Sequence, residues 1–155
     1  MSTMDLISKA LAALEASDNP MTVEVVHELI EPRDVNEPLG ISEAAECLAI
    51  SAHTLRYYEK CGLINVDRDA YGHRQYDAAA VRRIVFLSRM RLSGMSMRDL
   101  QQYVDLVDRG DSTIPERLDI LLEHRDSVRR RIRELQLSLV ATEYKIETYG
   151  GATGP

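Results

Sequence analysis

Residues 51–64 carry the stretch that decides the fold: Ser51-Ala52-His53-Thr54-Leu55-Arg56-Tyr57-Tyr58-Glu59-Lys60-Cys61-Gly62-Leu63-Ile64. The stretch predicts one short helix, because Ser51 can cap the first turn with its side-chain oxygen and Gly62 can adopt the left-handed conformation at the end. Leu55 is the inward residue, and an arginine followed by two tyrosines lies on the remaining surface. Such a surface suits a groove lined with phosphates and base edges.

A second short helix precedes this one. Residues 41–48 have Ile41, Ala45 and Leu48 on one side, and Ser42 is the expected N-cap. Only Ala49-Ile50 separates the two helices, which predicts a helix-turn-helix.

A small hairpin is predicted after the helix pair. Residues 65–76 have no helical periodicity, and Gly72 can take a positive φ in a tight turn. The hairpin would project Arg74 beside the helix, which is the arrangement called a wing.

Two further helices follow the wing. Asp77 is the expected cap of the first and Ser96 that of the second, with Asp99 three residues later in a near capping box. Gly94 separates them, so this segment predicts another helix-turn-helix-like pair.

The longest periodic segment begins at Ile114. Its seam alternates steps of four and three over five heptads, as in a coiled coil. The seam residues are Ile114, Leu118, Leu121, Arg125, Val128, Ile132, Leu135, Leu139, Thr142, Ile146 and Tyr149. A helix from Ile114 to about Thr148 would be roughly 50 Å long, too long to bury its seam on a small domain. A second copy of the chain is the natural partner.

Charge is unevenly distributed along the 155 residues, whose net charge is −6. Residues 1–38 hold 2 basic and 8 acidic residues, residues 39–100 hold 9 and 7, and residues 101–155 hold 8 and 10. Only the segment with the helix-turn-helix is net positive, which favours an interface with nucleic acid there. The acidic first segment could pack on the body, bind a partner or stay mobile.

Composition excludes several other classes. Cys47 and Cys61 are the only cysteines and make neither a disulfide framework nor a closed metal site. No apolar run approaches membrane-spanning length and no signal pattern is present, so we expect no membrane partner and a cytoplasmic location. No acid/base constellation, phosphate loop or nucleophile motif suggests an enzyme.

The motifs together resemble the MerR family of bacterial transcription regulators. The resemblance rests on residues 54–60, on Gly62-Leu63-Ile64 and on the pattern Gly72-x-Arg74-x-Tyr76, and it covers residues 39–149. It implies a mainly α fold, in which a winged helix-turn-helix domain precedes a long helix that forms an antiparallel coiled coil in a homodimer. It also implies binding to a palindromic promoter element, which the dimer bends and untwists so that RNA polymerase can engage both promoter boxes.

The resemblance also assigns roles to residues. Arg56 and His53 would meet the major groove, while Tyr57, Tyr58, Arg68, Arg74, Tyr76 and Arg91 would contact phosphates. The full candidate DNA-binding set is Ser51, His53, Thr54, Arg56, Tyr57, Tyr58, Arg68, Tyr71, Gly72, Arg74, Tyr76 and Arg91. The candidate dimerisation set is Leu118, Leu121, Val128, Ile132, Leu135, Leu139 and Ile146.

The sequence does not identify the effector to which such a regulator would respond. The chain has no cysteine after Cys61 and few residues after Tyr149, so a thiolate metal site, an iron–sulfur cluster and a ligand domain of the kinds found in the family are not expected, and no cofactor is predicted. The chain is most similar to the short aldehyde- and nitrosative-stress branch, although Arg89 stands where that branch usually has its sensing cysteine. Cys61 and Cys47 are candidate redox residues; small filler residues are the simpler interpretation of both.

The expected organisation therefore has four parts. An acidic extension, partly helical or mobile, occupies residues 1–38; the winged helix-turn-helix domain occupies 39–108; the dimerisation helix occupies 109–149; and a disordered tail occupies 150–155. The alternative function is a coiled-coil adaptor that has lost DNA binding and recruits a protein through its acidic extension.

Overall fold

The computed structural model describes residues 35–152. The expectations for residues 1–34 of the extension and for the last three residues of the tail lie outside the described residues. The chain forms two compact units, Met1–Leu92 and Ser93–Pro155. Their boundary falls inside the segment 39–108 that the sequence analysis assigned to DNA binding.

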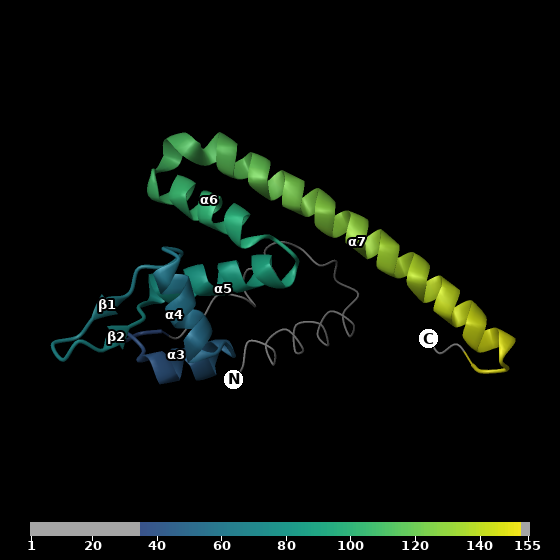
Figure 1. The fold of residues 1–155 in the computed structure, drawn as a ribbon, viewed down its shortest axis with the longest axis horizontal. Coiled ribbons are helices and arrows are strands. Elements are labelled where there is room, and N and C mark those ends of the chain that lie inside the picture. Colours follow the sequence, from purple (N-terminus) through teal and green to yellow (C-terminus); the bar gives the residue numbers. More distant parts are fainter. Residues whose placement is uncertain (1–34, 153–155) are drawn as a thin grey trace. The chain divides into compact units, whose positions relative to one another are not determined.

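The described part of the first unit contains three helices and a two-stranded hairpin (Figure 1). The order is α3 (Ile41–Leu48), α4 (Ala52–Lys60), β1 (Asp67–Arg68), β2 (Arg74–Gln75) and α5 (Ala78–Leu92). Helix α3 packs against α4, as predicted for a helix-turn-helix. Ala49 allows the tight turn between them by adopting a left-handed conformation, with φ of 52°.

Capping decides where these helices begin. The Ser51 side chain accepts a hydrogen bond from the Thr54 amide at 3.1 Å, which confirms the predicted cap of α4. Asp77 caps α5 in the same way, through the Ala80 amide at 2.7 Å. The prediction for Ser42 was wrong: α3 begins two residues earlier than a Ser42 cap would allow, with Gly40 at the N-cap position and no side-chain cap.

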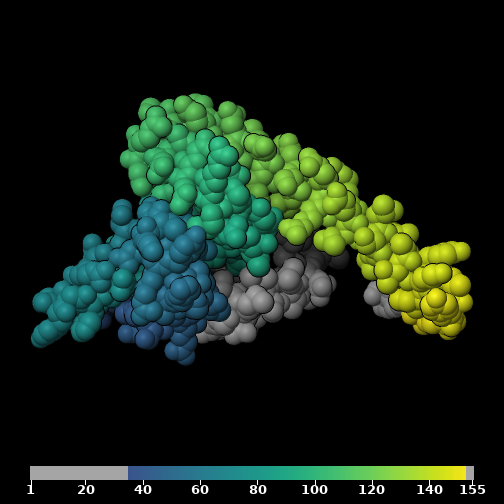
Figure 2. All heavy atoms as spheres, in the orientation of Figure 1, coloured from purple at the N-terminus to yellow at the C-terminus, as the bar shows by residue number. Residues whose placement is uncertain are grey.

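The wing is a short antiparallel ladder. Asp67 pairs with Gln75 and Arg68 with Arg74, and Gly72 has the expected positive φ, 83°. The backbones of Leu39 and Tyr76 exchange two hydrogen bonds of 2.8 Å. The start of the domain is thereby joined to the base of the wing, which projects from the unit (Figure 2).

The core of the first unit fills the space between the helices and the wing. It contains Ala44, Leu48, Leu55, Tyr58, Leu63, Ile64, Tyr76, Ala80, Val81, Ile84, Val85 and Leu87. Each of the three helices contributes residues to this core, so the positions of α4 and the wing are fixed by common packing.

The second unit consists of α6 (Met97–Asp108), the short 3₁₀ helix η1 (Asp111–Thr113) and α7 (Ile114–Thr148). Ser96 caps α6 through the Asp99 amide at 3.1 Å, as predicted. Helix α6 lies beside the first part of α7 (Figure 1). The buried Thr113 hydroxyl is within hydrogen-bonding distance of the carbonyl oxygens of Leu106 and Gly110, which fixes the turn between the two helices.

Helix α7 has the bounds that the heptads predicted. It spans 35 residues and none of its residues is fully buried. Leu118, Ile132, Leu135 and Leu139 of the predicted seam are each about half exposed or more, at 51%, 49%, 62% and 57%. None of the described helices is long and apolar enough to cross a membrane.

We predict that Ser51→Ala lowers the free energy of unfolding by about 1 kcal/mol, because the Thr54 amide loses its acceptor at the first turn of α4. Chemical denaturation followed by circular dichroism measures this change. Ser42→Ala is the matched control and should change stability by less than about 0.5 kcal/mol, because Ser42 is exposed and caps no helix. Equal losses in the two variants would contradict the capping role of Ser51.

Candidate nucleic-acid interface

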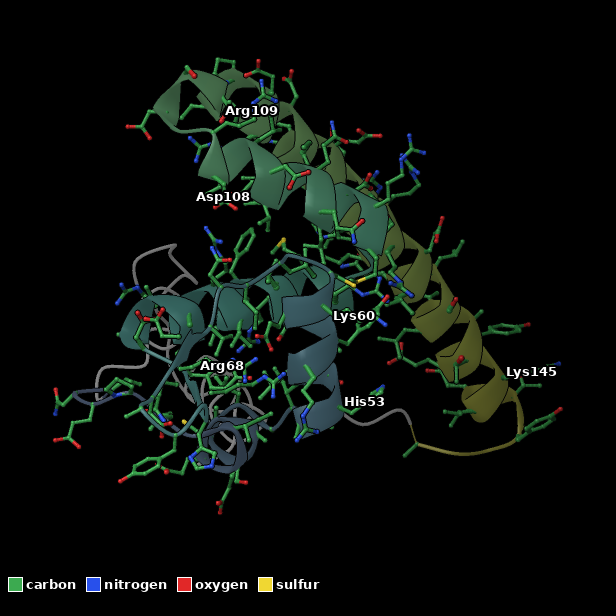
Figure 3. The ribbon with its side chains drawn as sticks, turned by 60° about the vertical axis from the view of Figure 1, so that its left-hand side comes forward. His53, Lys60, Arg68, Asp108, Arg109 and Lys145 are labelled. Atoms are coloured by element: carbon green, nitrogen blue, oxygen red, sulfur yellow. The ribbon has the colours of Figure 1, made fainter. Side chains whose placement is uncertain are left out.

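One face of α4 is open to solvent. His53, Arg56 and Tyr57 are exposed along it, and Thr54, half-buried, lies against the Ser51 hydroxyl at 2.9 Å. Figure 3 shows His53 near the first turn of α4 and Lys60 at its last turn, with Arg68 on the neighbouring strand. The exposed face therefore presents two permanent positive charges, Arg56 and Lys60, together with a histidine and an aromatic hydroxyl.

The two adjacent tyrosines of α4 differ in position. Tyr57 is 46% exposed, whereas Tyr58 is 6% exposed and lies in the core. Both were predicted to contact phosphates, but only Tyr57 offers substantial surface. Tyr58 contributes to the packing that holds α4 in place.

Tyr57 lies beside one of the candidate redox cysteines. A side-chain hydrogen bond between Tyr57 and Cys61 raises the pKa of the tyrosine above its ordinary value, and the positive charge of Arg91 acts in the opposite direction. Cys61 is half-buried and Cys47 is exposed on α3; both are free thiols. Tyr57, Cys61 and Arg91 thus form one neighbourhood at the end of α4.

The wing arginines share one carboxylate. Glu59 Oε2 accepts from Arg74 Nε at 2.6 Å, and Glu59 Oε1 accepts from Arg68 Nη2 at 3.1 Å. The hydrogen bond to Glu59 raises the pKa of Arg74. Glu59 was missing from the predicted set, although an acidic residue within a basic and aromatic stretch was a signal of pairing.

Tyr76 differs from its expected role. Tyr76 was predicted to contact a phosphate, but its side chain is completely buried. Burial raises the pKa of its hydroxyl, which has no hydrogen-bond partner among the described residues. A direct phosphate contact would need the core to open, so we assign Tyr76 to the packing beneath the wing.

The tip of the wing is ordered by an aspartate that the sequence analysis also missed. Asp69 Oδ1 accepts from the amides of Tyr71 and His73, each at 2.9 Å. The Tyr71 side chain, which was predicted to contact DNA, is 87% exposed. The pattern of an aspartate three residues before Gly72 was the available signal, because Asp commonly accepts hydrogen bonds from its own turn.

Two arginines, Arg89 and Arg91, lie in the last turn of helix α5. Arg91, the remaining candidate for a phosphate contact, is exposed. Arg89, at the position of the cysteine in the stress-sensing branch, is half-buried, and burial lowers its pKa. No group of three or more His, Cys, Asp or Glu side chains in residues 35–152 could hold a metal ion.

Comparison with known proteins decides the family. Residues 39–106 match the model of the MerR HTH family regulatory proteins, and residues 81–140 match the model described as MerR, DNA binding. An HTH-type transcriptional regulator of Haemophilus influenzae is 38% identical over 109 residues, which cover 70% of this chain and 81% of the relative. The chain belongs to the MerR family. It is a DNA-binding transcription regulator, and its relatives are regulators rather than enzymes.

Further relatives support the MerR assignment. The regulator AdhR of Bacillus subtilis is 39% identical over 88 residues, which cover 56% of this chain and 63% of the relative. Among solved structures, HiNmlR, a MerR family regulator lacking the sensor domain and bound to promoter DNA, superposes with a TM-score of 0.68 at 36% identity, covering 73% of this chain and 90% of that one. A MerR family regulator from Listeria monocytogenes gives a TM-score of 0.69 at 36% identity, with coverages of 72% and 86%.

We predict that the tip of this MerR wing loosens in acid. The pKa of Asp69 is lowered, chiefly because the His73 amide donates to the carboxylate. A lowered pKa stabilises the fold above the unfolded value of about 3.9, and that stabilisation is lost as the pH falls through the folded pKa. NMR should therefore show the amide signals of Tyr71 and His73 shifting together as the pH falls below about 3.9. In Asp69→Asn, which keeps an oxygen acceptor but does not titrate, the two signals should stay in place; unchanged movement would contradict the assignment.

Proposed function

We propose that this MerR regulator acts as a homodimer through α7, so that two copies of α4 and the wing reach two halves of a palindromic promoter element. The exposed seam of α7 is the observation that carries the proposal. A helix with large apolar residues about half exposed is unfavourable in water for a single chain. Pairing with the same helix of a second copy covers both seams at once.

Within each copy, the exposed face of α4 is proposed to read bases and the wing to contact the backbone. Arg56 and His53 are the base-reading candidates, because they lie exposed on the first two turns of α4. The proposed phosphate contacts come from Tyr57, Arg68, Arg74 and Arg91, with the exposed turn at Tyr71 and Gly72 close to the backbone. Ser51 and Thr54 order the first turn of the same helix.

Regulation is proposed to act through DNA shape. A dimer with two reading heads at a fixed spacing can bend or untwist the promoter between them, at a cost of a few kcal/mol that phosphate contacts offset. RNA polymerase would then engage the deformed promoter, in the cytoplasm where the chromosome lies. The alternative adaptor function has no observation in its favour, because the exposed Arg56 and the ordered wing suit DNA.

A stress signal is part of the proposal. One structural relative is a regulator lacking the sensor domain, and it binds promoter DNA. The signal would therefore act on the two units themselves. Footprinting on the promoter of the chain's own gene, before and after treatment with an aldehyde or an oxidant, tests this point; an unchanged footprint would remove the stress signal from the proposal.

We predict that Leu135→Glu combined with Leu139→Glu gives monomers, because two charges would enter the centre of the proposed apolar seam. Sedimentation velocity measures the oligomeric state. Leu137→Glu is the control: Leu137 is 72% exposed and lies about 200° around the helix from Leu135, so this variant should remain dimeric. A dimeric double variant would show that the seam is misplaced.

We predict that Arg56→Ala relaxes sequence preference. If Arg56 contacts a base edge, its loss costs about 1–3 kcal/mol on the preferred duplex and less on a shuffled one. Fluorescence anisotropy with both duplexes, over a range of salt concentrations, measures the two affinities. An equal loss on both would reassign Arg56 to the phosphate backbone.

A further inference from the structure

Glu59 joins the recognition helix to both strands of the wing. Arg68 lies in β1 and Arg74 in β2, and the two are directly opposed in the ladder. Each binds a different oxygen of the same carboxylate, which comes from the last turns of α4. One side chain therefore fixes both strands against the helix.

The contact leaves the arginines able to bind DNA. An arginine has five N–H donors, whereas a carboxylate only accepts. Arg74 uses Nε for Glu59, and Arg68 uses Nη2 for Glu59 and Nη1 for the Gly72 carbonyl oxygen at 3.3 Å. The Arg74 side chain is 27% exposed and that of Arg68 is 44% exposed. Donors on both guanidinium groups remain for a phosphate.

The contact also changes the charge that the wing presents. Two positive charges share one negative charge at 22% exposure, so the group is net +1 rather than +2. Attraction to any DNA grows with the number of positive charges that meet phosphates. The Glu59 carboxylate therefore lowers the sequence-independent attraction to DNA. It also orders the two guanidinium groups that produce this attraction.

We propose that Glu59 is a positioning residue that increases sequence discrimination. It holds the wing at a fixed offset from the base-reading face of α4, and it reduces attraction to unrelated DNA. The inference rests on the proposed use of α4 and the wing to bind DNA. It predicts two separable effects, one of geometry and one of charge.

Two substitutions separate these effects. Glu59→Gln removes the charge, and its amide offers only one oxygen to two arginines. Glu59→Asp keeps the charge, but its side chain is shorter by about 1.5 Å, so it cannot reach both arginines in place. Glu46→Gln is the charge-matched control, because Glu46 is an exposed residue of α3 and makes no ion pair with the wing arginines.

The DNA measurement uses a duplex that the wild-type protein enriches from a random pool, together with a shuffled duplex of the same composition. Affinities are measured over a salt series, after circular dichroism has shown native helix content. We expect the ratio of the two affinities to fall on the order of tenfold in both Glu59 variants. Only Glu59→Gln should also bind the shuffled duplex more tightly, with a salt slope steeper by about 0.9 per protomer.

The outcomes distinguish the inference from the proposed function. An unchanged ratio in both Glu59 variants would overturn the positioning role, and an equally steep slope in Glu46→Gln would overturn the charge effect. Wild-type protein that binds both duplexes without salt dependence would instead refute the proposed function.

A measurement on the free protein tests the contact without DNA. The Arg74 Nε–H signal in an NMR spectrum should be protected from exchange with water in the wild type and less protected in both Glu59 variants, where the two arginines compete for a single acceptor or a shorter side chain. An unprotected wild-type signal would overturn the inference whatever the DNA data show.

Discussion

The uncovered seam of α7 is the constraint on which the rest of the structure depends. Along its 35 residues, α7 has none that is fully buried, and each large apolar side chain left in water forgoes about 1.5–3 kcal/mol. Helix α6 covers only the first part of it. In the proposed homodimer a second chain covers the remaining seam, and symmetry then supplies a second reading head. The exposed apolar seam of α7 would thus bring two DNA-contacting units into one molecule.

The other requirement is a rigid relation between α4 and the wing. Each strand of the wing has two residues, and so short a ladder contributes little stability by itself. Three contacts outside the ladder stabilise the wing. Tyr76 is buried beneath it, Glu59 holds both arginines, and Asp69 closes the turn. Core packing and ion pairs together stabilise the conformation of the wing, as additional backbone hydrogen bonds would in a larger sheet.

Local signals in the sequence predicted local structure well. The caps at Ser51 and Ser96 and the end of α7 follow from side-chain chemistry and periodicity within a few residues of each feature. Contacts between distant residues were missed. Tyr76 was expected at a phosphate because nothing local shows that it is buried, and Glu59 was overlooked because its partners lie 9 and 15 residues away. The candidate interface depends on such contacts, so the burial and pairing of its side chains could not be predicted from local sequence.

The backbone pairing of Leu39 with Tyr76 limits how the chain can be shortened. Two hydrogen bonds of 2.8 Å join the backbone of Leu39, which precedes α3, to the backbone of Tyr76 at the base of the wing. A fragment cut after Leu39 would leave the N–H and C=O of a fully buried residue without their partners, and an unpaired buried backbone group costs about 1–3 kcal/mol. The smallest autonomous DNA-reading fragment must therefore include Leu39, even though the first described helix starts only at Ile41.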